Sequence, residues 1–263
     1  AKQSGSSNFQ FYVESMNAKA LEKLELQNGL YRAAVNHDFR AMYQPIVDLK
    51  SGQIIAVETL LRWNHPVRGP IPPSEFVPVA EESGLIVRIG QWVLQEACQQ
   101  MACWLSEGYD LEWIAVNISA RQFSEGNLVR HVNNALDESA LPAGFLELEL
   151  TESILMDNMT YTLQTLNDLK SMGVELAIDD FGTGYSSLSY LKQFPIDRLK
   201  IDRAFVSCLP DDVEDQRITQ AILAIAHSFN LSVVAEGVET RQQLDFLTEH
   251  HCDAGQGYFF GKP

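Results

Sequence analysis

Apolar, β-prone runs alternate with helical segments along this chain, and a carboxylate or amide stands at or next to the end of one run after another. An ionised carboxylate on a buried strand is costly unless it is paired or binds a metal ion. The residues concerned are Glu58, Asn117, Glu149, Asp179, Asp180, Glu236 and Gln256. Because the carboxyl ends of parallel strands share one edge of a barrel, this repetition predicts oxygen ligands collected at a single site.

The periodicity predicts eight strands, separated by helices. Such a βα alternation leaves either a closed barrel or an open doubly wound sheet. An open sheet would gather its ligands at one switch point, whereas nearly every strand contributes here, which favours the barrel. The first two strands are separated only by Lys50-Ser51-Gly52, too short for a parallel crossover. We therefore expect an α/β fold, a (β/α)8 TIM-type barrel with an antiparallel first strand, and the 263 residues suit that size.

The boundaries of these elements follow from hydrophobic spacing. The expected strands are Phe39–Leu49, Ile54–Trp63, Trp113–Ile118, Phe145–Leu150, Val174–Asp179, Arg198–Ile201, Ser232–Glu236 and Gly257–Phe260. The expected helices are Pro73–Glu82, Ile86–Ser106, Gln122–Glu138, Met159–Ser171, Ser187–Gln193, Val213–Phe229 and Arg241–Glu249. Residues 15–36 have one apolar helical face and are interpreted as a connecting helix, whereas residues 8–12 alternate like a strand without a partner.

Charge and cysteine content narrow the class of protein. A formal net charge of −16 argues against binding duplex nucleic acid, but a small phosphate ligand needs only local compensation by cations. No apolar run is long enough to span a membrane, and the first residues lack the apolar core of a signal peptide, so we expect no membrane contact from this segment. The four cysteines form no CxxC pair and are interpreted as reduced core thiols of a cytosolic protein.

The most specific stretch is Asp179-Asp180-Phe181-Gly182-Thr183-Gly184. Adjacent carboxylates at a strand end can engage two ions, and the glycines let the following loop approach a ligand. A helix N-cap pair on a glycine-rich turn is the alternative for this stretch taken alone.

Other strand-end residues also admit both a functional and a purely structural interpretation. Glu149 suits a metal ion, Glu152 could cap or hold the neighbouring glycine-rich loop, and Glu147 is interpreted as a solvated charge. Arg62 lies on the strand face of Glu58; we favour phosphate binding by its guanidinium over a Glu58–Arg62 salt bridge.

The remaining candidates complete an oxygen-rich site. Asn117 is a neutral oxygen ligand, and Lys200 and Asp202 share one side of their strand end. None of the six histidines stands at these strand ends, which favours Mg²⁺ or Mn²⁺ over zinc or copper. The sequence shows no nucleophile elbow, P-loop or GxGxxG fingerprint, so covalent catalysis and nucleotide-cofactor chemistry are disfavoured.

Taken together, these motifs closely resemble the EAL-domain family of bacterial cyclic di-GMP phosphodiesterases, from about residue 26 to residue 263. The family's fold is a (β/α)8 barrel with an antiparallel first strand, in agreement with the hairpin argument. One departure is Thr59, where the family signature has alanine; by strand alternation it should point away from the metal. The matching stretches are Val57–Trp63, Asn117–Ser119, Glu149–Glu152, Asp179–Gly184, Lys200–Asp202, Ala235–Glu239 and Gln256–Tyr258.

The resemblance implies a role for each matching residue. Glu58, Asn117, Glu149 and Asp179 match ligands of a first metal ion, and Asp179, Asp180 and Glu236 those of a second. Lys200 and Gln256 match residues that position the attacking water and the metal site. Glu152 matches the glutamate that holds the loop after Asp180, and Glu239 its support, while Gln44, Arg62 and Asp202 match dinucleotide contacts. Glu58, Lys200, Glu236, Gln256 and Glu152 form the expected catalytic set.

The implied reaction is metal-dependent hydrolysis of cyclic di-GMP to linear pGpG with two Mg²⁺ or Mn²⁺ ions. A catalytically inactive cyclic di-GMP receptor is the alternative, but such domains usually lack an acidic ligand and none is missing here. A protein-interaction scaffold would need neither metal nor dinucleotide, and a glycosidase barrel would not need this many ligands.

The resemblance also suggests a domain organisation. Residues 1–14 resemble the tail of a preceding GGDEF-like domain, residues 15–36 connect, and residues 37–263 form the barrel. Family members often form homodimers, so a homodimer with upstream GGDEF or sensor domains is expected. The location would be cytoplasmic, either free or as the cytoplasmic part of a membrane-anchored sensor.

Overall fold

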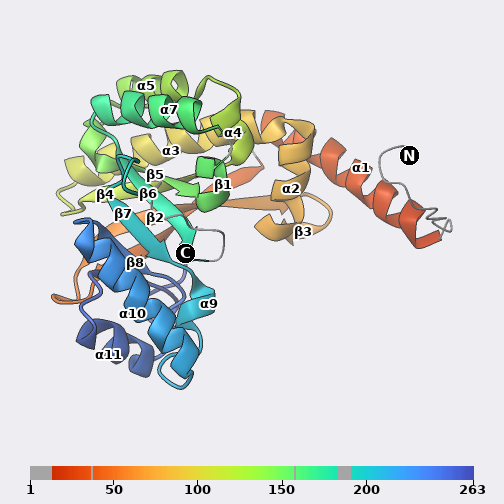
Figure 1. Cartoon of the computed structure of the whole chain (residues 1–263). Coiled ribbons are helices and arrows are strands. Elements are labelled where there is room, and N and C mark those ends of the chain that lie inside the picture. Colours follow the sequence, from red (N-terminus) through yellow and green to blue (C-terminus); the bar gives the residue numbers. More distant parts are fainter. Residues whose placement is uncertain (1–13, 37, 157, 183–190) are drawn as a thin grey trace.

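The computed structural model describes residues 14–36, 38–156, 158–182 and 191–263, and within these ranges a single nine-stranded sheet closes into a barrel (Figure 1). Strand β1 pairs antiparallel with β2 and β9, and parallel pairs run from β2 through β4 to β9 in sequence order. The short β3 extends β2 as a hairpin outside the barrel. The strands are β1 Phe39–Asp48, β2 Ile54–His65, β3 Gly69–Ile71, β4 Trp113–Ile118, β5 Leu146–Thr151, β6 Glu175–Phe181, β7 Arg198–Ile201, β8 Ser232–Ala235 and β9 Ala254–Gln256. The predicted eight-stranded barrel with an antiparallel first strand is confirmed.

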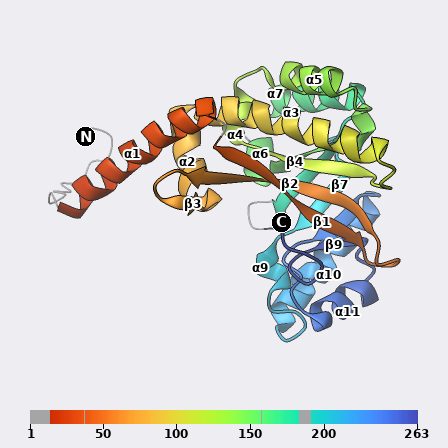
Figure 2. The same ribbon diagram turned by 180° about the vertical axis from the view of Figure 1, so that it is seen from behind.

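Helices cover the outside of the barrel. Helices α3, α5 and α7 lie together on one side, and α10 and α11 pack on the opposite side beside β7, β8 and β9 (Figures 1 and 2). The helices are α1 Glu14–Asn36, α2 Pro73–Ser83, α3 Leu85–Ser106, α4 Ala120–Ser124, α5 Leu128–Ser139, α6 Glu152–Met156, α7 Met159–Ser171, α9 Arg203–Val206, α10 Val213–Ser228 and α11 Arg241–Glu249, with a 3-10 turn at Ala143–Phe145. Within the described ranges, no helix combines the length and the apolar composition of a membrane-spanning segment.

Two predicted elements are wrong in position or extent, and the bounds of several others differ by one or two residues. The last strand is Ala254–Gln256 rather than Gly257–Phe260, because the chain turns after Gln256: the backbone N–H groups of Phe260 and Gly261 both donate to the Gly257 carbonyl at 3.1 Å. The predicted helix 122–138 is two helices, separated at Gly126, whose φ of 74° is left-handed. Glu236 follows β8 instead of ending it. The predicted helix 187–193 falls mostly on residues outside the described ranges.

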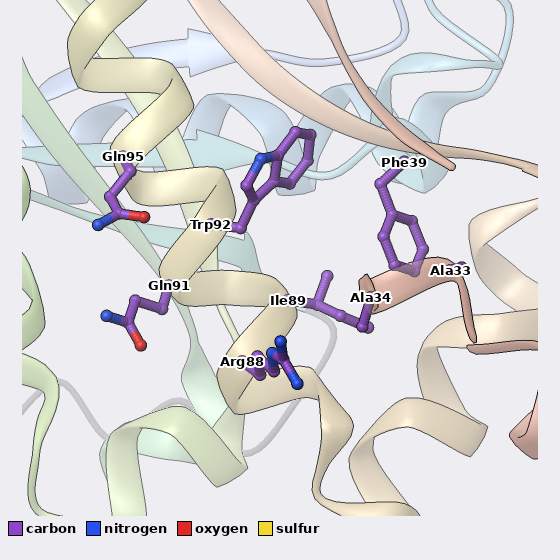
Figure 3. Close-up of a pocket in the computed structure, with 8 residues that line it drawn as sticks. All are labelled: Ala33, Ala34, Phe39, Arg88, Ile89, Gln91, Trp92 and Gln95. Atoms are coloured by element: carbon purple, nitrogen blue, oxygen red, sulfur yellow. The ribbon is translucent and has the colours of Figure 1, made fainter. Parts of the chain in front are cut away.

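The amino-terminal helix α1 is anchored at only one end. Its carboxyl-terminal half buries Leu26, Leu30 and Ala33 against the barrel, while its amino-terminal half projects away (Figure 2). A close view shows Ala33 and Ala34 beside Phe39 and Ile89, with Trp92 nearby on α3 (Figure 3). A cavity of about 260 Å³ remains at this junction. The helix predicted over residues 15–36 is therefore present as α1, and it packs on the barrel through α2 and α3.

The amino-terminal end of the barrel interior is closed by apolar side chains and one charged cluster. Arg198 pairs with Glu147 and lies 3.3 Å from Glu175 Oε2, with its guanidinium 3.6 Å over the Trp113 ring. Glu147 is 1% exposed, so its interpretation as a solvated charge is wrong: the even spacing of β5 turns it inward like Glu149. The apolar side chains that close this end of the barrel are Ile46, Ala56, Trp113, Ala115, Val234 and Ala254.

The cysteines also differ from their prediction. All four are free thiols, but only Cys98 and Cys252 are buried, whereas Cys103 and Cys208 are exposed. Burial raises the pKa of both buried thiols to about 12, so they remain protonated core groups. Cys103 lies on the outer face of α3 and Cys208 in the turn after α9, positions that sequence periodicity did not separate from the core.

Candidate active site

The centre of the candidate site is the ammonium group of Lys200, which is 1% exposed inside the barrel. Strands β2, β5 and β6 and the segment after β8 each direct one carboxylate at it. The Nζ atom lies 2.5 Å from Glu236 Oε1, 2.7 Å from Glu149 Oε1, 3.6 Å from Asp179 Oδ1 and 3.8 Å from Glu58 Oε2. The parallel register explains the convergence, because Asn117 pairs with Glu149, and Thr151 with Asp179, at the same end of the sheet.

A ring of amides holds Glu58 in place. Asn117 donates to Glu58 Oε1 at 2.6 Å, and Gln256 donates to Glu58 Oε2 at 2.6 Å and to Gln44 Oε1 at 3.1 Å. Gln44 stands directly opposite Glu58 in the β1–β2 pairing and donates to the Gly261 carbonyl at 3.1 Å. The antiparallel first strand thus brings Gln44 into the site, a position that the spacing of parallel strands alone would not provide.

The electrostatics of this cluster depend on burial. Burial raises the pKa of Glu149 well above its ordinary value, and the neighbouring carboxylates add to the effect against the opposing charge of Lys200. Burial likewise raises the pKa of Glu236 to about 7. Burial alone would lower the pKa of Lys200, but the four surrounding carboxylates outweigh it and raise that pKa well above the usual range. Lys200 is therefore a permanent positive charge at neutral pH.

The two adjacent aspartates lie on an irregularity of β6. The β6–β7 register shifts between Ile178 and Phe181, and Asp180 has a left-handed φ of 54°, rare for a residue other than glycine. The bulge turns Asp179 toward Lys200 and Asp180 toward Asp202, whose carboxyl group shares a hydrogen bond with it. Burial, the charge of Asp179 and this bond raise the pKa of Asp180 to about 6. Asp202 also caps α9 by accepting from the Ala204 backbone N–H at 2.8 Å.

Besides Asp180 and Asp202, three predicted residues lie outside the lysine-centred cluster. Arg62 donates to the Leu61 carbonyl at 3.0 Å and lines a different cavity, and the Glu58–Arg62 salt bridge is not formed. Glu152 begins α6 and is 7% exposed, with no hydrogen-bond partner among the described residues. The loop that it was expected to hold, residues 183–190, lies outside the described ranges. Glu239 pairs with Arg203 at 2.8 Å.

Thr59 faces away from the acidic cluster. It lines a cavity of about 300 Å³ together with Val77 of α2 and Gly90 of α3, while the preceding Glu58 points at Lys200. The Thr59 hydroxyl group is buried and has no hydrogen-bond partner among the described residues. Strand alternation therefore turns Thr59, the residue that departs from the family signature, away from the site.

The donor set fits hard divalent cations. It consists of carboxylates and one amide, and both oxygens of the fully buried Glu149 lack hydrogen-bond geometry with any described residue although Lys200 lies 2.7 Å away. Among the described residues no three His, Cys, Asp or Glu side chains are already arranged around a common metal position. In the described cluster the Lys200 ammonium and the amides of Asn117 and Gln256 contact the same carboxylates that would serve as ligands.

One positively charged residue near the site was missed by the sequence reasoning. Arg203 lines a cavity of about 190 Å³ together with Gln44, Glu58, Glu236 and Gln256. The sequence signal that could have identified Arg203 as a site residue is its position directly after the Lys200-Ile201-Asp202 motif. Tyr258, exposed at the same cavity, was assigned to a strand instead.

The fold and the site define a (β/α)8-type barrel with an acidic, lysine-centred site at the carboxyl ends of its strands. The profile of the EAL domain matches residues 27–263, nearly the entire chain. The chain belongs to the EAL domain family.

Curated relatives match over the whole chain. They include the bifunctional diguanylate cyclase/cyclic di-GMP phosphodiesterase MucR of Pseudomonas aeruginosa, 48% identical over 264 residues, and the cyclic di-GMP phosphodiesterase NbdA of the same species, 42% identical over 263 residues. Each alignment covers 100% of this chain but only 38% of MucR and 34% of NbdA. The chain thus spans about a third of the length of these relatives.

Solved structures share the fold. A structure described as the PaMucR phosphodiesterase in complex with c-di-GMP superposes with a TM-score of 0.88 at 48% identity, covering 91% of this chain and 97% of that one. The EAL enzyme Bd1971 in its cAMP- and cyclic-di-GMP-bound form gives a TM-score of 0.87 at 35% identity, covering 95% of this chain and 69% of that one.

Proposed function

We propose that this chain is a metal-dependent phosphodiesterase that hydrolyses cyclic di-GMP to linear pGpG. The observation that carries the proposal is the buried cluster of Glu58, Glu149, Asp179 and Glu236 around Lys200, in a chain that is 48% identical to MucR. The names of MucR, NbdA and the Escherichia coli protein PdeR all specify cyclic di-GMP phosphodiesterases, which supports the same substrate here.

The proposed metal ligands are the residues that match the family's ligands, and four of them, Glu58, Glu149, Asp179 and Glu236, lie around Lys200. Glu58, Asn117, Glu149 and Asp179 would hold one ion, and Asp179, Asp180 and Glu236 a second, with Mg²⁺ or Mn²⁺ as the expected species. Two such ions, when bound, supply charge that neutralises a phosphodiester and lowers the pKa of a water molecule. The family's phosphodiesterases depend on metal ions in general; which ion serves this chain is part of the proposal.

The remaining residues would position the substrate and move protons. Lys200 contributes a fixed positive charge within 4 Å of each of the four carboxylates. In the metal-free site Glu236, with a pKa of about 7, can accept or return a proton at its carboxylate near neutral pH, and a bound ion would lower that pKa. Gln256 orients Glu58 through its 2.6 Å hydrogen bond. Gln44, Arg62 and Asp202 are proposed to contact the dinucleotide, with Glu152 and Glu239 supporting loops around the site.

The setting in a larger protein belongs to the same proposal. Residues 1–14 would end an upstream GGDEF-like domain, residues 15–36 would connect, and residues 37–263 would form the catalytic barrel. A cytoplasmic location and a homodimer are proposed on the strength of the family alone.

The test is incubation of the purified chain with cyclic di-GMP and Mg²⁺ or Mn²⁺, with and without chelator, followed by chromatography of the products. Metal-dependent appearance of pGpG is the expected result. Glu58→Gln should remove turnover, whereas Asp245→Asn, which alters only an exposed pair with Arg241, should not. Binding of cyclic di-GMP without product would identify a receptor, and neither binding nor product would leave a scaffold.

A further inference from the structure

The mouth of the active-site cavity carries a positive charge that the proposed function has not used. The cavity's buried members are Gln44, Glu58 and Gln256, and its exposed members include Arg203, Glu239 and Tyr258. Among the described residues that line this cavity, Arg203 is the only cation; Glu58, Glu236 and Glu239 are acidic.

The fold holds the backbone and the first side-chain atoms of Arg203 close to the lysine-centred cluster. Arg203 is the first residue of α9, three positions after Lys200, and Asp202 caps that helix. Its stem lies against the backbone of Gly237, because a Cβ at position 237 would lie 2.3 Å from Arg203 Cγ. Gly237 also has a left-handed φ of 69°, which disfavours any side chain there. The guanidinium is exposed at this cavity and pairs with Glu239 at 2.8 Å.

The substrate's charge explains why such a group is needed. A cyclic dinucleotide carries two phosphodiesters, each with one negative charge, and only one of them is cleaved. The second must rest near a mouth whose other charged groups are carboxylates, which repel it. A guanidinium group can donate two parallel hydrogen bonds to a phosphate. The ion pair of Arg203 with Glu239 is solvent-exposed, so breaking it to bind a phosphate costs little free energy.

We propose that Arg203 binds the phosphodiester of cyclic di-GMP that is not cleaved, and so positions the dinucleotide over the lysine-centred site. The inference rests on the proposed function and deepens it: Arg203 makes the site selective for a substrate with two phosphates. It acts on the bound dinucleotide, not on the scissile bond. Its removal should therefore weaken substrate binding more than chemistry.

The experiment compares Arg203→Gln and Arg203→Lys with the wild-type chain, using steady-state hydrolysis of cyclic di-GMP in Mn²⁺. Arg203→Gln should raise KM at least about tenfold with kcat changed less than about threefold, because one charge-assisted contact is lost. Arg203→Lys should recover part of the loss. The matched control is Arg241→Gln, which removes a similarly exposed arginine paired with Asp245 on α11 and should leave KM unchanged.

A substrate with a single phosphodiester, bis(p-nitrophenyl) phosphate, provides a second readout. Its kcat/KM should be the same in Arg203→Gln and the wild type. An unchanged KM for cyclic di-GMP in Arg203→Gln, or a loss confined to kcat, would overturn the assignment, and so would an equal loss on both substrates. If the wild-type chain fails to cleave cyclic di-GMP, the proposed function itself fails, a result distinguishable from all of these.

Discussion

At the scale of single residues, the site is a compromise between burial and charge. Four carboxylates surround one ammonium group, so the cluster carries excess negative charge when all are ionised. Burial, and to a lesser extent that excess, raise the pKa values of Glu149 and Glu236. Residues arranged for chemistry therefore destabilise the fold until cations are bound, a trade between stability and activity that is common in enzyme sites.

Glu149→Gln tests this trade directly. The amide keeps the shape of the side chain but removes a buried charge, so the chelated protein should gain on the order of 1 kcal/mol in its free energy of unfolding. Turnover and metal affinity should both fall, because a buried anionic ligand is lost. Urea denaturation with chelator present, alongside the turnover assay, measures both. A destabilised variant would mean that Lys200 depends on Glu149 more than on its other three partners.

A pH dependence follows from Glu236. Its folded-state pKa of about 7 lies above the ordinary value of 4.5, so the folded state binds more protons between these values. The stabilising contribution is complete below about pH 4.5 and is lost as pH rises through 7. We therefore expect the melting temperature of the chelated protein to fall between pH 5 and 8, with a shallower fall in Glu236→Gln. Added Mg²⁺ or Mn²⁺ should stabilise more strongly as pH rises, because protons compete with metal. Identical slopes in wild type and variant would contradict the assignment.

At the scale of elements, α1 shows how one helix can carry two apolar faces. Leu26, Leu30 and Ala33 are buried on the barrel, whereas Leu21, Leu24 and Tyr31 are more than half exposed. The sequence pattern predicted a single apolar face for residues 15–36, whereas the structure buries Leu30 completely and leaves Leu24 55% exposed. Periodicity identified the helix but could not say which of its two apolar faces the barrel would cover.

A pair of leucine substitutions measures that difference. Leu30→Ala removes a fully buried side chain and should cost about 2–5 kcal/mol in the free energy of unfolding. Leu21→Ala, at a residue 60% exposed, should change it by less than about 0.5 kcal/mol. Chemical denaturation of both variants provides the comparison. Equal effects would show that α1 is not seated as described.

At the scale of the whole molecule, the two ends of the barrel have different roles: the closed end stabilises the fold, and the other end carries the candidate active site. Strand β7 contributes Arg198 to the closed end and Lys200, two residues on, to the site end, and β5 contributes Glu147 and Glu149 in the same way. Such a division is general in barrels of this class, where the carboxyl ends of the strands carry the reaction.

Arg198→Gln should therefore act on stability more than on turnover. It leaves Glu147 buried without its counter-charge, an effect of about 3–5 kcal/mol when one partner of a buried pair is lost. We expect a markedly lower melting temperature, with kcat at 15 °C within a few-fold of wild type for the folded protein. Loss of kcat without loss of stability would show that the two ends are coupled.

The sequence by itself determined the alternation of strands and helices, the antiparallel start, and the identity of the acidic, amide and lysine residues at the strand ends. These follow from local rules: period-two and helical spacing, a linker too short for a crossover, and the cost of unpaired charge on buried strands. Three features depend on the tertiary structure alone. Glu147 is buried with Arg198, and Glu58 accepts hydrogen bonds from Asn117 and Gln256. Arg203 lines the cavity at the site. Those contacts join residues from about 50 to nearly 200 positions apart, and only the closure of the barrel brings them together.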